Sequence, residues 1–428
     1  MLVGDNGIII QAQRAKKETE QAGQDEQKIL DDYELSIKEA TGEKVYKLGE
    51  EPKLMENPPS YSWIEGNNPD IDNTNFYVAY DINTNTINKS FTYHGVVEQA
   101  GSVFPANSCV VDKTALVTDI DSYIEILTIE FETESNIIEL LFNGYPYAII
   151  QVDEGQGYEY VTYDASRQYN GSLHLLKLEF EEIKNRKIKI ETNARFGGAY
   201  ILNNTSINPV QIDEEKAIFI GTSITERKGA LGYYNIISNR LSLDGYNWGV
   251  GATGYVTQPS YGTGIRYNYY NRLVVNKDFI KDADIICIEG GINDTNQDIN
   301  DVVNEQSKCI DFIRENAPNA KIIIIGVFWP RGEENNTASS LNNALRENCL
   351  NKKVPFIDLL TGDTIAADGT IISKGTGPYI TGTGYVGAEK GDGNADIYIE
   401  EDGTHPTQEG CNYLGNRFAE EFYKILNY

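Results

Sequence analysis

Three short, wholly apolar segments in the second half of the chain place the strongest limit on its fold. They are Ala217-Ile218-Phe219-Ile220, Ile285-Ile286-Cys287-Ile288 and Ile322-Ile323-Ile324-Ile325. A strand that is apolar at every position has both faces buried, which is typical of a parallel sheet covered by helices. A fourth strand is expected at 354–357, and helical periodicity is found at about 230–243, 299–313, 337–350 and 408–426. The sequence therefore predicts a three-layer α/β domain with a parallel sheet at 213–428.

The preceding region, 51–212, follows a different pattern. Apolar and polar residues alternate at 123–131 and again at 187–191. Turn residues recur between such stretches, for example Asn143-Gly144 and Gly197-Gly198. Short alternating strands with turns between them predict an antiparallel β-sandwich. No residues in this region have a catalytic spacing.

The first segment, 1–50, is polar and is predicted to be an N-terminal helix. Its heptad-like seam has steps of four and three residues, but small and polar side chains occupy it. Two interpretations stay open: a solvated tail helix, or a coiled coil that is ordered only inside an assembly. On the second interpretation, the segment attaches a homotrimer to a larger particle. The seam residues are Ile8, Ala12, Ala15, Thr19, Ala22, Glu26, Ile29, Tyr33, Ser36 and Ala40.

Charge and composition exclude several classes of function. The 428 residues include 36 Lys and Arg against 64 Asp and Glu, a net charge of −28. Such a field repels nucleic-acid backbones and anionic membrane surfaces. The 5 cysteines form no CxxC pair, which argues against a zinc site or a disulfide framework, and Cys287, Cys309 and Cys349 are expected to be buried free thiols. We expect no membrane span and, because Asp5 and Asn6 follow the first residues at once, no signal peptide.

Polar residues follow two of the apolar strands. Ser223 comes just after the first strand, at the edge where open α/β sheets bind ligands, and Gly221 allows a tight turn there. Asn293 follows the second strand, where its amide could donate to an oxyanion. The structural alternatives are a helix-capping serine and an Asn/Asp turn.

A histidine and an aspartate lie three residues apart before the last predicted helix. In this arrangement Asp402 can accept from one ring nitrogen of His405 and leave the other to face a serine. The remaining histidines, His94 and His174, lie in the β region, where we expect structural roles. His405 is therefore the candidate general base of the α/β domain.

Together, these residues resemble the sequence blocks of the SGNH, or GDSL-type, hydrolase superfamily. Gly221-Thr222-Ser223 resembles the first block, and the segment 247–254 resembles the second. Gly291-Ile292-Asn293-Asp294 matches the third block, and Asp402-Gly403-Thr404-His405 matches the last. The resemblance covers about 215–428 and implies an SGNH-like, flavodoxin-like fold. The β region is similar to the jelly-roll module that some carbohydrate esterases of this superfamily carry.

The resemblance also implies a mechanism that needs no metal and no organic cofactor. Ser223 would attack an ester carbonyl, His405 would take its proton, and Asp402 would orient the histidine. The oxyanion would be held by the Ser223 N–H, by the N–H of Ala252 or Gly251, and by the Asn293 side chain. Two departures from the family pattern are Thr222, where an aspartate is usual, and Ala252, where a glycine is usual.

The expected substrate is a small acyl group, acetyl above all, on a bacterial surface glycan. Aromatic residues that could stack on sugar rings, with Tyr255 and Trp329 as the candidates, support this expectation, although such residues also serve as core packing. One alternative is a receptor-binding protein whose hydrolase fold only holds glycan. Another is a lipase-like enzyme or thioesterase, which the lack of an obvious apolar lid disfavours.

Two further segments are similar to phage-tail proteins. Residues 4–8 and the positions after them resemble the start of prophage tail proteins, and 393–399 resembles SGNH modules of phage tails. The localisation expected from this likeness is the virion or the outside of the cell.

Overall fold

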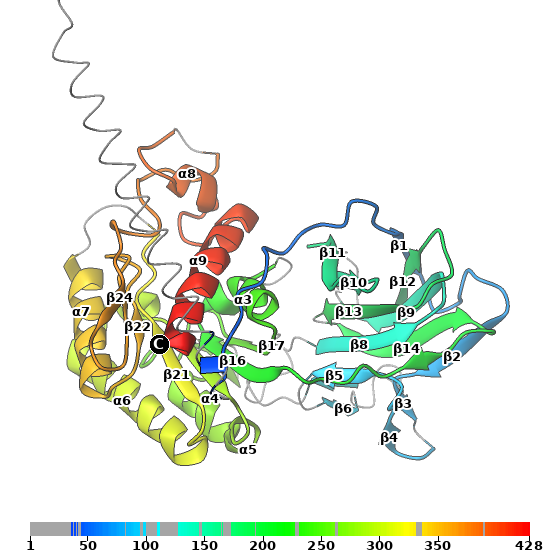
Figure 1. Ribbon diagram of the computed structural model, residues 1–428, viewed down its shortest axis with the longest axis horizontal. Coiled ribbons are helices and arrows are strands. Elements are labelled where there is room, and N and C mark those ends of the chain that lie inside the picture. Colours follow the sequence, from blue (N-terminus) through cyan, green and yellow to red (C-terminus); the bar gives the residue numbers. More distant parts are fainter. Residues whose placement is uncertain are drawn as a thin grey trace, which may run out of the picture.

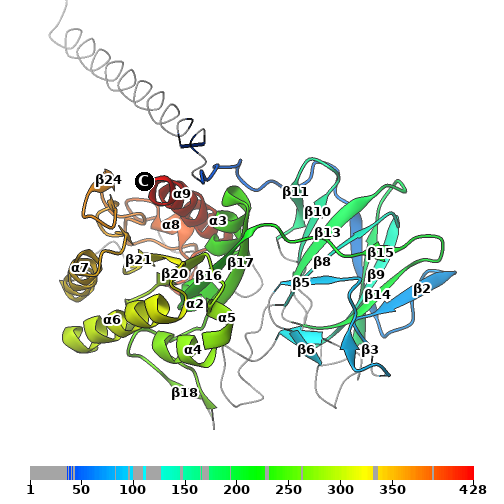
Figure 2. The same cartoon turned by 60° about the horizontal axis from the view of Figure 1, so that its bottom comes forward.

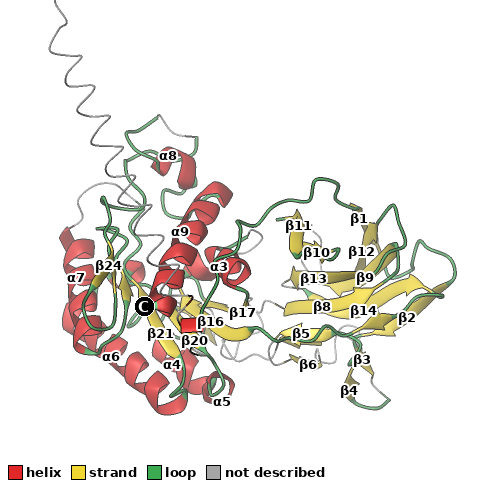
Figure 3. Cartoon of the chain, viewed as in Figure 1, coloured by secondary structure: helices red, strands yellow, loops and turns green. Residues whose placement is uncertain are grey.

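The computed structural model describes two regions of different architecture. The described residues are 36, 38–39, 41, 44–81, 83–94, 97–99, 109–111, 127–144, 148–163, 165, 173–192, 194–226, 231–261, 264–330, 336–387 and 390–428. Figures 1 and 3 show the helices gathered in one half of the molecule and a strand-rich body in the other. Within these described residues, no helix combines the length and the apolar character needed to cross a bilayer.

A mostly parallel sheet forms the centre of the C-terminal half. The predicted apolar segments are its inner strands, and Ile288, for example, pairs with both Ile220 and Ile324. The strands are parallel from β17 to β22, and the last two are antiparallel additions. In sheet order they are β17 (Leu243–Gly249), β16 (Glu215–Gly221), β20 (Ile285–Glu289), β21 (Lys321–Ile325), β22 (Phe356–Ile357), β23 (Thr364–Ile365) and β24 (Ile371–Ser373).

Helices cover both faces of this sheet (Figure 2). Phe219 and Cys287 face one core, which α3 (Tyr233–Leu241) and α9 (Gln408–Asn427) close. Ile218 and Ile286 face the other core, against α4 (Tyr269–Val275), α5 (Lys277–Ile280), α6 (Ile299–Asn316) and α7 (Asn336–Asn351). The predicted three-layer α/β class is thus confirmed, and the predicted helices lie within a few residues of the observed ones. Shorter helices are α2 (Ser223–Glu226), η1 (Ile292–Asp294) and α8 (Ala395–Tyr398).

Two antiparallel sheets pack face to face in the N-terminal half, around a shared core that includes Phe131 and Phe142. The first contains β1 (Ser60–Glu65), β12 (Leu173–Glu179), β9 (Ile137–Asn143), β14 (Arg195–Leu202), β7 (Cys109–Val111), β6 (Val97–Gln99) and β2 (Thr74–Val78). The second contains β11 (Tyr158–Thr162), β10 (Ala148–Asp153), β13 (Arg186–Thr192), β8 (Leu127–Thr133), β15 (Ile207–Asn208) and β5 (Thr92–His94). A small ribbon joins β3 (Tyr80–Asp81) to β4 (Thr86–Ile87), and another joins β18 (Ser260–Tyr261) to β19 (Gly264–Ile265).

The edge strand β17 was not predicted. Its sequence, LDGYNWG, has neither a continuous apolar run nor strict alternation. It pairs along its whole length with β16 and has no partner strand on its other side among the described residues. An edge strand buries less surface than a central one, so its sequence carries a weaker hydrophobic signal.

The segment before the sandwich is anchored to the α/β half. Tyr46 lies in the same core as α3 and α9, and its backbone N–H donates to the Asn427 side chain at 2.9 Å. Gly49 exchanges hydrogen bonds with Arg240 of α3. The predicted N-terminal seam, apart from Ser36, lies outside the described residues, and so does its assembly role.

Candidate functional site

Ser223 stands at the carboxyl end of β16, as the first residue of the short helix α2. The chain passes from strand to helix here through Gly221, whose position leaves no room for a side chain. A Cβ atom on Gly221 would lie 1.9 Å from the Thr225 hydroxyl oxygen and 2.7 Å from Glu289 Oε2. This tight turn exposes the Ser223 side chain at the sheet edge.

His405 reaches Ser223 from the turn that precedes α9. His405 Nε2 lies 2.8 Å from Ser223 Oγ, and His405 Nδ1 lies 2.5 Å from Asp402 Oδ2. The backbone N–H groups of Thr404 and His405 donate to Asp402 Oδ1 at 2.8 and 2.9 Å, which fixes the carboxylate. Gly403 between them has a φ of +68°, a left-handed conformation that favours glycine. The structure therefore brings together the three side chains that the sequence singled out.

The electrostatics of this trio suit proton transfer from the serine to the histidine. Burial raises the pKa of Asp402, but the hydrogen bonds from the His405 ring and from two backbone amides outweigh burial and leave that pKa below its ordinary value. An ionised Asp402 holds the proton of His405 on Nδ1, so Nε2 can accept from Ser223. The side chains of His405 and Asp402 are 33% and 46% exposed, so the trio is open to solvent.

The loop after β17 lies beside Ser223, and its hydrogen bonds decide which N–H can bind an oxyanion. The Gly251 N–H donates to Glu226 Oε2 at 2.5 Å. The Gly251 N–H is therefore not available to bind an oxyanion, contrary to the prediction, because it already donates to Glu226. The N–H groups of Ser223 and Ala252 donate to no other described residue, which leaves both available.

Arg266 fixes the orientation of the Ala252 N–H. Its Nη1 donates to the Gly251 carbonyl at 2.8 Å. In a trans peptide the C=O and the following N–H point in opposite directions, so the bond to Arg266 also sets where the Ala252 N–H points. Ala252 itself has a φ of +62°, a left-handed conformation that glycine adopts more readily than alanine.

Asn293 completes this edge of the sheet, in the short helix η1 after β20. One hydrogen of its amide donates to the Thr253 carbonyl at 2.8 Å, which ties the side chain to the loop of Ala252. The second amide hydrogen remains for a ligand. The neighbouring Asp294 is buried and accepts from the N–H groups of Tyr255, Val256 and Thr257, which holds the rest of the loop.

Behind the serine lies a buried polar network that the sequence analysis missed. Glu289, the last residue of β20, accepts from both the N–H and the hydroxyl of Thr222 and from the hydroxyl of Thr225. Burial raises the pKa of Glu289 even though these donors oppose it. An aspartate at position 222 would face this carboxyl group, whereas the Thr222 hydroxyl donates to it. A charged residue at the end of a wholly apolar strand was the available sequence signal.

Arg272 of α4 is also fully buried and ties three loops together. Its guanidinium donates to the carbonyls of Gly221 and Trp248, at the ends of β16 and β17, and to the Thr253 hydroxyl at 2.9 Å. The ends of both strands and the loop that carries Ala252 and Thr253 are thus held by one side chain. Neither Arg266 nor Arg272 belongs to a sequence block, so spacing alone gave no signal for them.

The two aromatic candidates for sugar contact differ. Tyr255 is 0% exposed and packs edge-on against Tyr269 at 4.9 Å between ring centroids. It has no free ring face, so the prediction that Tyr255 stacks on a sugar is wrong. Trp329 follows β21 at the same sheet edge as Ser223 and is only partly buried, so its role stays a prediction.

The cysteines and the other histidines occupy structural positions. Cys287, Cys309 and Cys349 are buried free thiols, as predicted, and Cys411 is a fourth. His174 is buried in the sandwich. His94 lies at the boundary between the two halves, where its Nδ1 is 2.5 Å from Asp244 and its Nε2 is 2.8 Å from Glu130.

The family comparison agrees with this geometry. Residues 219–412 match the model of the GDSL-like Lipase/Acylhydrolase family. Over this range the chain is similar to GDSL-type hydrolases. The matched range contains Ser223, Ala252, Asn293, Asp402 and His405, and the sandwich lies outside it. No curated protein matches this chain in sequence.

Solved structures with similar folds extend the likeness to both halves of the chain. The salicylyl-acyltransferase SsfX3 from a tetracycline biosynthetic pathway has a TM-score of 0.57 at 13% identity, covering 82% of this chain and 97% of that one. A family two carbohydrate esterase from Cellvibrio japonicus has a TM-score of 0.51 at 10% identity, with coverages of 82% and 98%. A putative GDSL-like lipase from Bacteroides ovatus has a TM-score of 0.50 at 15% identity, with coverages of 78% and 98%. At these identities the likeness concerns the fold.

Proposed function

We propose that this protein is a serine esterase that removes a small acyl group, most of all O-acetyl, from a bacterial surface or cell-wall glycan. One observation carries the proposal: Ser223 Oγ lies 2.8 Å from His405 Nε2, while Asp402 holds the other ring nitrogen at 2.5 Å. A nucleophile, a base and a group that orients the base are then in mutual contact.

In the proposed reaction, Ser223 Oγ attacks the ester carbonyl while His405 takes the serine proton. The oxyanion that forms accepts from the Ser223 N–H, the Ala252 N–H and the free amide hydrogen of Asn293. His405 gives its proton to the leaving sugar oxygen, and an acyl-serine remains. Water then loses a proton to His405 and attacks the acyl carbon, which releases acetate and restores Ser223.

Three observations support a glycan as the carrier of the ester. The Ser223–His405–Asp402 trio is open to solvent, which suits a group projecting from a polymer better than a long acyl chain that must be enclosed. Trp329 offers a partly exposed ring at the same sheet edge. The similar fold from Cellvibrio japonicus is a carbohydrate esterase that likewise aligns over both halves of this chain.

The test is acetate release from acetylated polysaccharides by the purified full chain, with Ser223→Ala as the matched variant. Acetate should appear with the wild type and be lost with Ser223→Ala. Glycan binding by both proteins without acetate release would favour the receptor-binding alternative. Acyl transfer to an added alcohol with no net hydrolysis would contradict the esterase assignment.

We also propose that the N-terminal segment attaches the protein to a larger particle, such as a phage tail, as a trimer. Because Tyr46 and Gly49 pack on the α/β half, a truncation that tests this should remove residues 1–35 only. That truncation should lower the oligomeric state seen by light scattering and leave ester turnover unchanged. A truncated protein that remains a trimer would contradict the proposal.

A further inference from the structure

A cavity lies between the two halves of the molecule, away from Ser223. Its volume is about 590 Å³, within the range of small-molecule sites. One wall is α3 and the start of β17, and the other is the outer face of the sandwich sheet that contains β10, β11 and β13. Because Leu243 and Gly249 lie at opposite ends of β17, roughly 20 Å of strand separates this cavity from the edge that carries Ser223.

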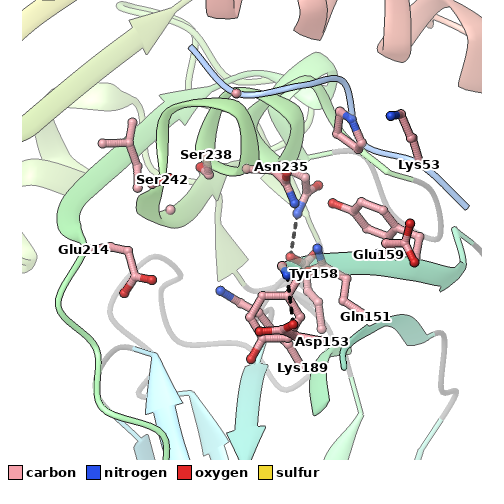
Figure 4. A pocket seen from close by; sticks show the side chains of 18 of the residues that line it. Lys53, Gln151, Asp153, Tyr158, Glu159, Lys189, Glu214, Asn235, Ser238 and Ser242 are labelled. Carbon is pink, nitrogen blue, oxygen red and sulfur yellow. Dashed lines mark hydrogen bonds between the residues drawn. The ribbon is translucent and has the colours of Figure 1, made fainter. Parts of the chain in front are cut away.

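The alternation of β13 explains why this cavity has a polar floor. Ile188 and Ile190 point into the sandwich core, so Lys187, Lys189 and Glu191 point outward. Gln151 of β10 and Tyr160 of β11 lie in the same row as Lys189. In an isolated sandwich this row would face bulk water, whereas here it faces α3 (Figure 4).

Bridging contacts join the two walls beside the cavity. Glu191 accepts from the Tyr234 hydroxyl at 2.5 Å and from the Asn235 amide at 2.8 Å, both on α3. His94 and Asp244 form a second bridge between the halves. The walls are therefore fixed by buried contacts, and the space between them is a built feature of the interface.

Two side chains that line this space have unused hydrogen-bonding capacity. The side chains of Gln151 and Lys189 form no hydrogen bond or close ion pair with a described residue, although the Lys189 charge acts on Glu130, Glu191 and Asp244. Lys189 lies 5.9 Å from the centre of the Tyr158 ring, and Figure 4 shows the strand residues opposite Asn235 and Ser238 of α3. Gln151 and Lys189 are partly exposed, so their side chains are free to form hydrogen bonds with a ligand.

The chemistry of the lining selects one class of ligand. Carboxylates outnumber lysines among the described residues around the cavity, which disfavours phosphate, sulfate and other anions. Amide, hydroxyl, ammonium and carboxylate groups line the same space and match the alternating donors and acceptors of a polyol. The partly buried Tyr158 is the tyrosine of the lining that could contact a pyranose.

We propose that this interdomain cavity is a non-catalytic binding site for a neutral saccharide. A glycan bound there would contact both the sandwich and the hydrolase domain. It would stay on the enzyme without entering the Ser223 site. The proposal goes beyond ester hydrolysis and does not depend on it, because the probes need carry no ester.

The test is calorimetric titration of the full chain with cellohexaose, xylohexaose and an N-acetylglucosamine pentamer. We expect saturable binding of at least one probe, and a loss of about tenfold or more in affinity with Lys189→Met and with Gln151→Leu. Lys177→Met is the matched control, since Lys177 lies on the other sheet of the sandwich. Turnover of a short-chain aryl ester should be the same in all three variants, and their thermal unfolding shows whether each is folded.

Two outcomes would overturn the proposal. If none of the three probes binds the wild type, the cavity holds water alone. If binding survives both cavity variants but is abolished when Ser223 is covalently blocked, the sugar binds instead at the sheet edge that carries Ser223. The protein could also bind sugar through this cavity and release no acetate. That result would contradict the esterase proposal but support this binding site.

Discussion

Two histidines in this protein hold a carboxylate at 2.5 Å on Nδ1, and their second ring nitrogens set them apart. His405 presents Nε2 to a serine hydroxyl and is 33% exposed. His94 presents Nε2 to Glu130 and is 4% exposed, at the boundary between the two halves. A carboxylate can only accept, so both nitrogens of His94 must donate, whereas a hydroxyl lets Nε2 of His405 accept. The partner of the second ring nitrogen therefore distinguishes the candidate base, His405, from a structural clamp made of His94, Glu130 and Asp244.

The largest effect should follow from removing the base. His405→Gln should lower turnover of a short-chain aryl ester by about 10⁴-fold or more, because Ser223 loses its proton acceptor. Thermal unfolding should change little, since His405 lies in an exposed turn. Steady-state kinetics and a melting curve measure the two effects, and near-normal turnover would remove His405 from the mechanism.

The oxyanion donors should give the next largest effect. Asn293→Ala removes a side-chain donor and should lower kcat by about 10²–10³-fold. Arg266→Ala should cost less, about tenfold, because it loosens the Gly251–Ala252 peptide without removing its N–H.

A readout on the transition state distinguishes these roles from loss of packing. Affinity for a boronic acid that forms a tetrahedral adduct with Ser223 should fall in parallel with kcat, while KM stays nearly constant. Arg266→Lys, which retains a donor, should recover part of the loss. A change in KM alone would contradict the assigned role of Arg266.

The clamp histidine should show the opposite pattern. His94→Gln leaves Glu130 and Asp244 buried without their cation and should lower the free energy of unfolding by about 3 kcal/mol. Turnover per folded molecule should stay within about twofold, because the clamp lies at the other end of β17 from the oxyanion loop. Denaturant unfolding and steady-state kinetics measure the two effects. A large loss of turnover with unchanged stability would instead indicate a catalytic role for His94.

The clamp should also fail in acid. Burial raises the pKa values of Glu130 and Asp244, but His94, together with the Lys189 charge and a tyrosine hydroxyl at each carboxylate, outweighs burial and holds both below their ordinary values. A carboxylate whose pKa is lowered by folding stabilises the protein above its unfolded pKa, near ~4, and this stabilisation is lost as the pH falls through the folded value. The stability difference between wild type and His94→Gln should therefore shrink below about pH 4. A constant difference down to pH 2 would contradict the ion-pair account.

The same comparison explains what the sequence could predict. Asp402 and His405 lie on one turn, and Ser223 and Asn293 follow strongly apolar strands, so short-range patterns were enough to find them. The clamp joins positions 94, 130 and 244, and Arg266 acts on a carbonyl 15 residues away. These contacts depend on tertiary packing that no local period encodes.

Burial was the other quantity that local patterns could not supply. Tyr255 and Trp329 are both aromatic residues near predicted site segments, yet one is enclosed in the core and the other is partly open. The edge strand β17 escaped prediction for a related reason, because the sandwich buries its polar Asp244, and this contact leaves no local pattern. The Asp244 side chain bonds His94 of the sandwich.

The central claim is that Ser223 is an activated nucleophile, and covalent labelling tests it most directly. The native full chain is incubated with a fluorophosphonate, and the adduct is located by mass spectrometry of its peptides. A single adduct is expected on Ser223, absent from Ser223→Ala, strongly reduced in His405→Gln and unchanged in His94→Gln. No adduct on native protein, or labelling that is equal in wild type and His405→Gln, would contradict it.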